Sequence, residues 1–291
     1  MSVKSWRDKA IQTILVGAAS TSILIVLLIF FFLGREAFPF IWEPGFSNLF
    51  QARWIPVSFK EEVFGLLPLV TGSLLVTGLA TVLMVPFGVF GAIYIAELAT
   101  EKERSFLKPF IEILAGIPSV VIGFFGLVVL SPIIKNFFGL NTGLTALTGA
   151  ILLALMAVPT VITVSEDAIQ SVPKAFREAS LALGANNLQT IFRIIVPAAL
   201  PGMIAAIMLG VGRVIGETMA VLMVTGNAAK LTLDPFSSVR TMTATIAAEM
   251  GEVAFGSHHY QALFWVGIFL LIMTFFLNVI AQRVLRKYQM R

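Results

Sequence analysis

Six long runs of this sequence contain no Asp, Glu, Lys or Arg, and they restrict the possible folds more than any other feature. Each run is 19 to 34 residues long, and a helix needs about 20 apolar residues to cross a bilayer. The runs are too long and too continuous for barrel strands, which alternate over roughly 10 residues. We therefore predict an all-α, polytopic membrane protein with six transmembrane helices, within residues 11–33, 63–96, 113–134, 136–165, 194–212 and 253–282.

The composition agrees with a membrane protein and excludes several other classes. Hydrophobic residues make up 58% of the chain and charged residues 12%, which rules out a soluble domain with a charged surface. The absence of cysteine excludes disulfides, cysteine-held Fe–S clusters and thiol nucleophiles. The first apolar run is too long for a signal-peptide core and lacks a cleavage site of the A-x-A type. We therefore interpret it as a retained first span.

The basic residues are distributed unevenly between the two sides that six spans create. If both termini are cytoplasmic, 13 of the 20 Lys and Arg residues lie in cytoplasmic segments and 6 in extracytoplasmic ones. This excess follows the positive-inside rule. The net charge of +4 thus indicates orientation in a membrane and not a nucleic-acid surface. We expect residues 97–109 and 166–196 on the cytoplasmic side, and 34–62 and 226–256 on the other.

The chain is predicted to have two parts. Residues 1–62 would form a basic N-terminal tail, the first span and an extracytoplasmic segment, and residues 63–291 a five-helix core. Prolines such as Pro118 and Pro159 interrupt the spans of this core, and each frees a backbone carbonyl that lipid cannot satisfy. That pattern is typical of transporters, although ordinary kinked packing is the alternative.

The cytoplasmic connection over residues 166–196 predicts two short helices. Pro173 suits the start of the first helix and Gly184 its end, while Asn186 can cap the second with Gln189 three residues later. Apolar residues recur along the first helix at three- and four-residue spacing, at Ala175, Phe176, Ala179, Ala182 and Leu183. Such an amphipathic helix docks in a groove of a partner or lies on lipid headgroups with its cations snorkelling.

The segment "EASLALGANNLQTIFRIIVP" resembles the EAA loop of ABC-importer permeases. The family pattern is Glu-Ala-Ala, three residues, Gly, nine residues, Ile, one residue and Leu-Pro. This chain matches the spacing and departs mildly from it at Ser180 and Val196. The resemblance implies that the loop, about residues 166–197, contains a coupling helix that seats in a cleft of a separate ATPase subunit. The implied contact residues are Glu178, Ala179, Ala182, Leu183 and Gly184.

Three further segments narrow the resemblance, namely Leu114–Leu130, Ser165–Pro173 and Gly212–Asn227. Together they are similar to the PstC-type permeases of phosphate importers. The resemblance implies the type I ABC importer permease fold, location in the inner membrane and transport of inorganic phosphate. It also implies three kinds of partner: a homologous second permease (PstA-like), an ATPase dimer (PstB-like) and an extracytoplasmic phosphate-binding protein (PstS-like). ATP and Mg would bind to the ATPase, so this chain is expected to hold no cofactor and to catalyse no reaction itself.

Arg213 and Glu217 are placed inside an otherwise uncharged fifth span. A charge at the bilayer centre costs roughly 2.5–3.5 kcal/mol on insertion scales. At i and i+4 the two residues would share one face of a helix, where they could form a structural pair. Alternatively, the planar guanidinium of Arg213 offers donors that match an anion, and Glu217 could accept a hydrogen bond from the proton that phosphate keeps. The family resemblance implies a substrate pathway through spans 5 and 3, with Thr218 and Ser119 beside it.

Other functions remain open at this stage. The same architecture could transport another oxyanion, such as molybdate or sulfate. An ion-coupled secondary transporter would need no EAA loop and should show more spans or an inverted repeat, and a membrane scaffold would need no pathway. The adjacent His258 and His259 should point apart, so we expect no metal site. The sequence contains no P-loop.

Overall fold

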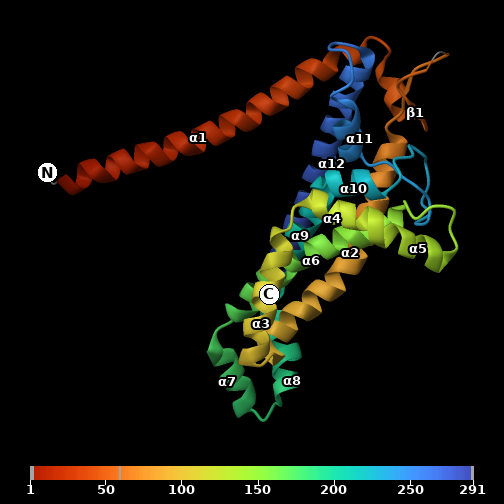
Figure 1. Ribbon diagram of the computed structural model, residues 1–291. Helices are drawn as coiled ribbons and strands as arrows, with labels where there is room; N and C mark the ends of the chain where they lie inside the picture. The colour runs from red at the N-terminus through yellow and green to blue at the C-terminus, as the bar shows by residue number, and fades with distance from the viewer. Residues whose placement is uncertain (1–2, 59, 290–291) are drawn as a thin grey trace.

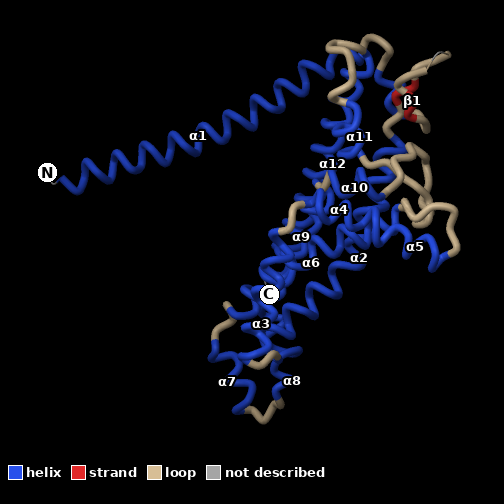
Figure 2. The backbone as a smooth tube through the Cα atoms, viewed as in Figure 1, coloured by secondary structure: helices blue, strands red, loops and turns tan. Residues whose placement is uncertain are grey.

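The computed structural model describes residues 3–58 and 60–289, which are mostly helical (Figure 1, Figure 2). Its α-helices are α1 (Val3–Ala37), α2 (Leu67–Ile93), α3 (Glu101–Gly116), α4 (Ser119–Phe125), α5 (Ser131–Phe138), α6 (Ala146–Gln170), α7 (Lys174–Ala182), α8 (Asn187–Thr190), α9 (Val196–Gly216), α10 (Met219–Val224), α11 (Met242–Glu249) and α12 (His258–Gln289). Five of the 13 basic residues that predict the orientation are affected by the limits of the described structure. Arg291 lies outside the described residues, and so do the side chains of Lys4, Arg7, Arg286 and Lys287.

Short elements complete the described chain. Two 3-10 helices, η1 (Phe38–Ile41) and η2 (Phe46–Phe50), precede an antiparallel pair of two-residue strands, β1 (Trp54–Ile55) and β2 (Val63–Phe64). Three π-helical turns continue or join α-helices, and these are η3 (Tyr94–Leu98), η4 (Gly126–Leu130) and η5 (Ile191–Ile195).

Six helices within the described residues are long and apolar enough to cross a membrane, which confirms the predicted number. They cover Asp8–Ile41, Leu67–Leu98, Ser119–Phe138, Ala146–Gln170, Asn187–Gly216 and His258–Arg283. The third span begins later than its uncharged run, because Ile117 is extended (ψ 129°) and separates α3 from α4. Pro118 accounts for this break, since its ring disfavours the helical conformation in the residue before it.

Helix α1 projects away from the other helices (Figure 1). Its C-terminal end contacts α12, where the rings of Phe32 and Phe264 lie 5.6 Å apart and the Trp265 indole donates to the Ala37 carbonyl at 2.8 Å. The most apolar part of α1 buries nothing within this chain. Lipid or another protein must therefore cover it.

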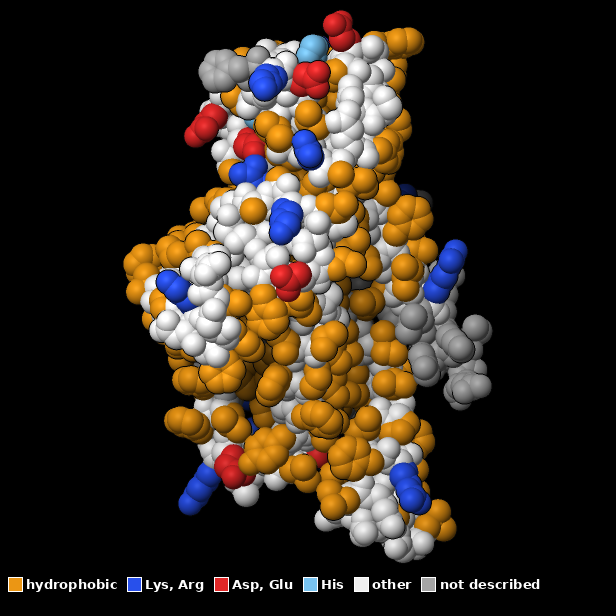
Figure 3. All heavy atoms as spheres, turned by 90° about the vertical axis from the view of Figure 1, so that its right-hand side faces the viewer, with side chains coloured by type: hydrophobic (Ala, Val, Ile, Leu, Met, Phe, Trp, Pro, Cys, Tyr) orange, Lys and Arg blue, Asp and Glu red, His pale blue; other side chains and the backbone are white. Residues whose placement is uncertain are grey.

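The two groups of connecting segments lie at opposite ends of the molecule. Helices α7 and α8 lie at one end, and β1 and α11 lie toward the other (Figure 1). On the face in Figure 3, hydrophobic side chains form a band across the lower middle, with charged side chains above and below it. This grouping agrees with the predicted sides, whereas the assignment of one end to the cytoplasm and the boundary after residue 62 stay predictions.

The centre of the bundle consists of α2, α6 and α9, which all contact one another. Val161 of α6 is fully buried between Gly88 of α2 and Gly210 of α9. A Cβ added at Gly210 would lie 2.7 Å from Cγ2 of Val161, and one at Gly88 would lie 2.6 Å from its Cγ1. The missing side chains therefore allow the three helices to approach closely, as small residues do in membrane bundles.

We predict that Gly210→Ala destabilises the protein by about 1–3 kcal/mol, the usual cost of overpacking. The measurement is thermal unfolding in detergent, followed by tryptophan fluorescence. Val161→Ala removes the opposing methyl group, so the double variant should lose less stability than the two single variants together. Gly78→Ala is the matched control, because a Cβ there meets nothing within 4 Å. Additive losses in the double variant would contradict this account of the contact.

Candidate functional site

The fifth span ends between the two charged residues that the sequence places together. Helix α9 ends at Gly216, Glu217 is extended (φ −71°, ψ 132°) and α10 begins at Met219. The expectation that Arg213 and Glu217 share one face of a continuous helix was therefore wrong. Tertiary and capping contacts replace the missing helical bonds: Oε1 of Glu217 accepts from the Ala220 N–H at 3.3 Å, and its carbonyl accepts from Thr243 at 2.9 Å.

Arg213 has a partner on another helix. Its Nη1 donates to Oγ1 of Thr160 in α6 at 3.1 Å, and the residue is half-buried. Among the ion pairs of the described residues, none joins Arg213 to Glu217. The structure thus gives no support to a structural pair. A guanidinium has five N–H donors, so the contact with Thr160 orients the group while occupying one of them.

The surroundings of Arg213 are open on one side. Gly212 and Gly216 are exposed, and a Cβ at either position would meet nothing within 4 Å. Close helix packing at this Gly-x-x-x-Gly therefore does not occur within the described chain. The half-buried Thr218 follows the break directly, and its hydroxyl donates to the Gly216 carbonyl at 3.3 Å.

The other predicted pathway residue lies on an adjacent helix. Ser119 is half-buried and is the first residue of α4. Helix α4 packs against α10, where a Cβ at Gly123 would lie 3.0 Å from the Cα of Ala220. The broken regions of spans 3 and 5 are therefore neighbours. The roles assigned to Arg213, Glu217, Thr218 and Ser119 stay predictions.

The structure adds hydroxyl groups that sequence reasoning missed. A small cavity beside Glu217 is lined by four hydroxyl side chains. They belong to Ser73 and Thr77 of α2 and to Thr241 and Thr243 at the start of α11. The volume of the cavity is about 10 Å³, roughly enough for one water. Ser73 accepts from the Met242 N–H at 2.9 Å, which attaches α11 to α2. No signal in the sequence identifies these residues, because Ser and Thr in a span commonly bond to their own helix.

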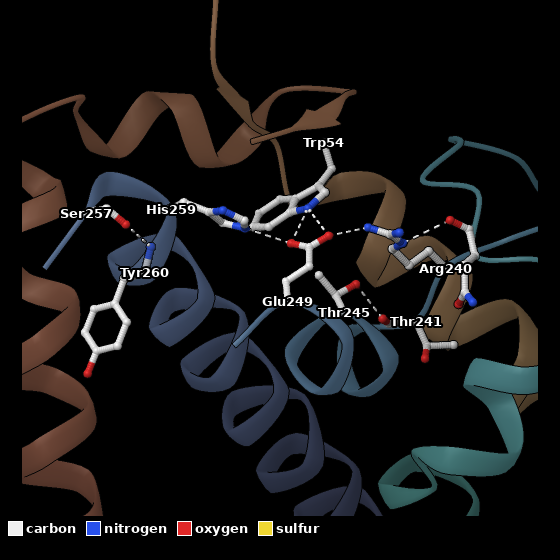
Figure 4. Close-up of polar contacts among 9 residues, drawn as sticks. Trp54, Arg240, Thr241, Thr245, Glu249, Ser257, His259 and Tyr260 are labelled. Atoms are coloured by element: carbon white, nitrogen blue, oxygen red, sulfur yellow. Dashed lines mark hydrogen bonds and ion pairs between the residues drawn. The ribbon is translucent and has the colours of Figure 1, made fainter. Parts of the chain in front are cut away.

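A polar cluster holds the far end of α11 (Figure 4). Glu249 accepts from the indole N–H of Trp54 at 3.1 Å, contacts Nε2 of His259 at 2.8 Å and forms an ion pair with Arg240. Arg240 in turn donates to the Asn227 carbonyl at 3.0 Å. The cluster joins β1, the loop before α11 and the start of α12. Because α11 begins at the residues that contact Glu217, this cluster also supports the break in the fifth span.

The environment of Glu249 favours its charged form. Burial alone would raise the pKa of this carboxyl, but the hydrogen bond from His259, the charge of Arg240 and the bond from Trp54 outweigh burial and lower the pKa below 4.5. His259 therefore serves this cluster. Among the described residues, no group of His, Cys, Asp or Glu is arranged to hold a metal.

The loop over residues 166–196 adopts the two predicted helices. Helix α7 follows Pro173, and the chain then turns at Gly184 with φ +85°. Helix α8 has a capping box in which Asn186 and Gln189 each bond to the other's backbone. Buried Ser180 of α7 bonds to Thr190 of α8 at 2.9 Å, so the two helices form one unit.

The predicted coupling residues lie on the open surface of this unit. Glu178, Ala179, Ala182, Leu183 and Gly184 are all exposed. Phe176 is 51% exposed and Leu183 89% exposed. Apolar side chains gathered on one small helix at the end of the molecule indicate a docking surface. The contact itself stays a prediction.

The segment that contains the loop and the broken spans matches a known family. The sequence profile of the binding-protein-dependent transport system inner membrane component family matches residues 84–289. This chain belongs to that family. As a binding-protein-dependent permease, it is a multi-pass protein of the inner membrane and a transport subunit. Family membership decides against the secondary transporter and the scaffold that the sequence left open.

Individual relatives cover nearly the whole permease. The chain is 40% identical to the probable ABC transporter permease protein YqgH of Bacillus subtilis (strain 168), over 89% of this chain and 82% of that one. It is 30% identical to the phosphate transport system permease protein PstC of Mesorhizobium japonicum, over 99% and 96% of the two chains. It is also similar to a chain in the crystal structure of a bacterial alginate ABC transporter, with a TM-score of 0.66 at 18% identity, over 96% and 98% of the chains.

The structural likeness confirms the predicted fold. The permease is all-α, and its six spans are arranged as in the permeases of type I ABC importers. At 18% identity this likeness concerns the fold alone. The family profile begins at residue 84, inside α2, and so does not test the predicted boundary after residue 62.

We predict that Glu249→Gln lowers the stability of the permease by about 1–3 kcal/mol at neutral pH, because it removes a charged hydrogen-bond acceptor from a half-buried cluster. The lowered pKa sets the pH dependence. The carboxylate's contribution is complete above 4.5, its ordinary pKa, and is lost as the pH falls through the lowered value. Thermal unfolding of wild type and variant should therefore converge on acidification. The exposed Glu252→Gln is the control, and a pH-independent difference for Glu249→Gln would contradict this explanation.

Proposed function

We propose that this chain is one permease subunit of an ATP-driven importer for inorganic phosphate. The observation that carries the proposal is its 30% identity with a phosphate transport system permease over 99% of the chain. The open, half-buried guanidinium of Arg213 provides matching chemistry at the break in the fifth span. An anion crossing there would meet a permanent positive charge in place of the water that it leaves.

Each pathway residue would have its own role. The bond to Thr160 orients the fork of Arg213, so that other N–H groups can donate to two phosphate oxygens. The Ser119 hydroxyl adds a donor at the start of α4, and Thr218 would add one by turning its hydroxyl away from the Gly216 carbonyl. Glu217 uses one oxygen to cap α10, and the carboxylate would accept a hydrogen bond from the O–H group that phosphate keeps at neutral pH. Sulfate has no such proton, so the same carboxylate would repel it.

The driving force would come from outside this chain. Helix α7 would seat in a cleft of a PstB-like ATPase dimer, which binds ATP and Mg, while this chain holds no cofactor. Closure of the dimer on ATP would move α7 and open the pathway outward to a PstS-like binding protein. The apolar surface of α7, with Phe176 and Leu183 exposed, supports this contact.

A second permease and lipid would cover the remaining apolar surface. Within the described chain α1 buries only its C-terminal end, and Gly212 and Gly216 are exposed beside Arg213. A PstA-like permease on that side would enclose the pathway between two chains. With α7 facing the ATPase, both termini and residues 97–109 would lie in the cytoplasm.

Gly184→Val should uncouple the permease from its ATPase. The φ of +85° at Gly184 strains any β-branched residue, although its Cβ would have open space around it. We expect normal insertion, loss of stimulated ATP hydrolysis and loss of uptake, measured in reconstituted vesicles. Gly139→Val is the matched control, because Gly139 also has positive φ and open space but lies at the end of α5. Equal losses in both variants would show general destabilisation and contradict the specific role of Gly184.

Arg213→Gln should reduce phosphate uptake about tenfold or more, because a lost hydrogen bond to a charged group costs roughly 1.5–3 kcal/mol. The assay is uptake of radiolabelled phosphate by cells that depend on this importer, with assembly checked by co-purification. Arg283→Gln makes the same change at an exposed position of α12 and should leave uptake unchanged. Normal uptake by assembled Arg213→Gln would refute the anion site.

Competition in the same assay separates the oxyanions. Excess unlabelled phosphate should block uptake, and excess sulfate or molybdate should not. Glu217→Gln should reduce uptake and weaken the discrimination against sulfate. Efficient competition by sulfate or molybdate in the wild type would instead favour the alternative function, a permease for another oxyanion.

A further inference from the structure

An ion pair joins the coupling helix to the second span. Arg177 of α7 pairs with Glu97 of η3, whose side chain is only 4% exposed. Turn η3 continues α2 without a break in the chain's helical course. A π-helical turn holds more residues per turn than an α-helix, which changes the direction of the side chains at its end, and such turns are frequent at functional sites. The pair therefore connects α7 directly to the end of span 2.

The other contacts of α7 lead to the fifth span. Helix α7 packs against α8 and η5, and Ser180 bonds to Thr190. Turn η5 runs directly into α9, the helix that carries Arg213. A displacement of α7 therefore reaches span 5 through packing and through the chain itself. It reaches span 2 by a different route, through Glu97.

A cavity shows why the ion pair matters for the second route. A space of about 390 Å³ lies beside Glu97 and Arg177, and its lining includes Ala96 of η3, Ile169 of α6 and Lys174 of α7. The lining is mixed, with apolar residues such as Val172 and Ile195 beside the charged groups, and these walls do not pack against one another across the space. An ion pair with directional hydrogen bonds keeps two helices at a fixed separation beside such a gap better than loosely packed apolar side chains do.

At its other end, α2 contacts the break in the fifth span. Ser73 accepts from the Met242 N–H at 2.9 Å, and the next residue, Thr243, donates to the Glu217 carbonyl at 2.9 Å. Helix α2 therefore has one end at the coupling helix and the other at the candidate substrate site. A helix attached at both ends can carry a displacement between them if both attachments hold.

We propose that the Arg177–Glu97 ion pair is a positioning contact that makes spans 2 and 5 move together when the coupling helix moves. The proposal rests on the proposed function of α7 as the ATPase contact. Without the pair, α7 loses its direct attachment to α2, so α2 and the hydroxyls around Glu217 follow the movement of α9 only through apolar packing, and less completely. ATP hydrolysis then continues while fewer anions cross for each ATP.

The first experiment measures phosphate uptake and ATP hydrolysis together in vesicles containing the full complex. Glu97→Gln and Arg177→Gln should each lower the ratio of uptake to hydrolysis about fivefold or more, the lower range of typical coupling effects. The reversed pair, Arg177→Glu with Glu97→Arg, should restore most of the ratio. Lys174→Gln is the control, because it removes a neighbouring charge from the wall of the same cavity, and its ratio should not change.

Two results of this experiment would overturn the proposal. A purely structural pair would lower the yield of complex, with uptake and hydrolysis falling in proportion and their ratio unchanged. Independent roles of the two residues would make the losses add in the reversed pair, with no rescue.

The second experiment does not depend on which solute is transported. The chain has no cysteine, so Phe90→Cys and Leu181→Cys, both at exposed positions, can carry spin labels on α2 and α7 in the assembled complex. The label separation should stay constant with and without ATP in the wild-type background, and should vary with ATP in Glu97→Gln. The same behaviour in both backgrounds would refute the link. A complex that hydrolyses ATP but imports no phosphate would contradict only the proposed function.

Discussion

Lipid offers no hydrogen bonds, so every interruption of a transmembrane helix must be satisfied by the protein itself. The break at Glu217 shows how this chain meets the requirement. The side chain of Glu217 caps α10, and Thr243 supplies a donor for the Glu217 carbonyl. Thr243 is in turn held by α11, whose two ends are fastened by Ser73 and by the Glu249 cluster. The segments at the α11 end of the molecule therefore stabilise an irregular backbone that lies inside the bundle.

The break at Glu217 also separates the charges of Arg213 and Glu217, which are only four residues apart in the sequence. A continuous helix would bring Arg213 and Glu217 together as a neutral pair, with little attraction left for a passing anion. The break instead gives each charge its own partner, Thr160 for the guanidinium and the α10 backbone for the carboxylate. Neutralisation is incomplete at the guanidinium, which is the condition that a transient anion site needs.

Charged contacts also organise the end of the molecule that carries α7 and α8. Glu166 of α6 is nearly fully buried, and Arg104 and Lys108 of α3 contact it at 2.9 and 3.0 Å. Together with the Arg177–Glu97 pair, these contacts hold α3 and α7 against the ends of the spans. Arg177 of α7 faces its own bundle, whereas the apolar Phe176 and Leu183 stay exposed on the outer surface. That division suits a part that moves as a unit between two bodies.

The sequence alone determined the number of spans, through the length of the uncharged runs. It also determined the two helices of the 166–196 loop, through the cap at Asn186 and the turn at Gly184. Both results depend on local patterns. The sequence also singled out Arg213 and Glu217, because charges are costly in lipid. Only the tertiary structure decided their geometry. The break at Glu217 depends on Thr243, which is distant in the sequence, and the partner of Arg177 is Glu97, on another span. Long-range hydrogen bonds and ion pairs carry no local pattern, so residue spacing could not predict them.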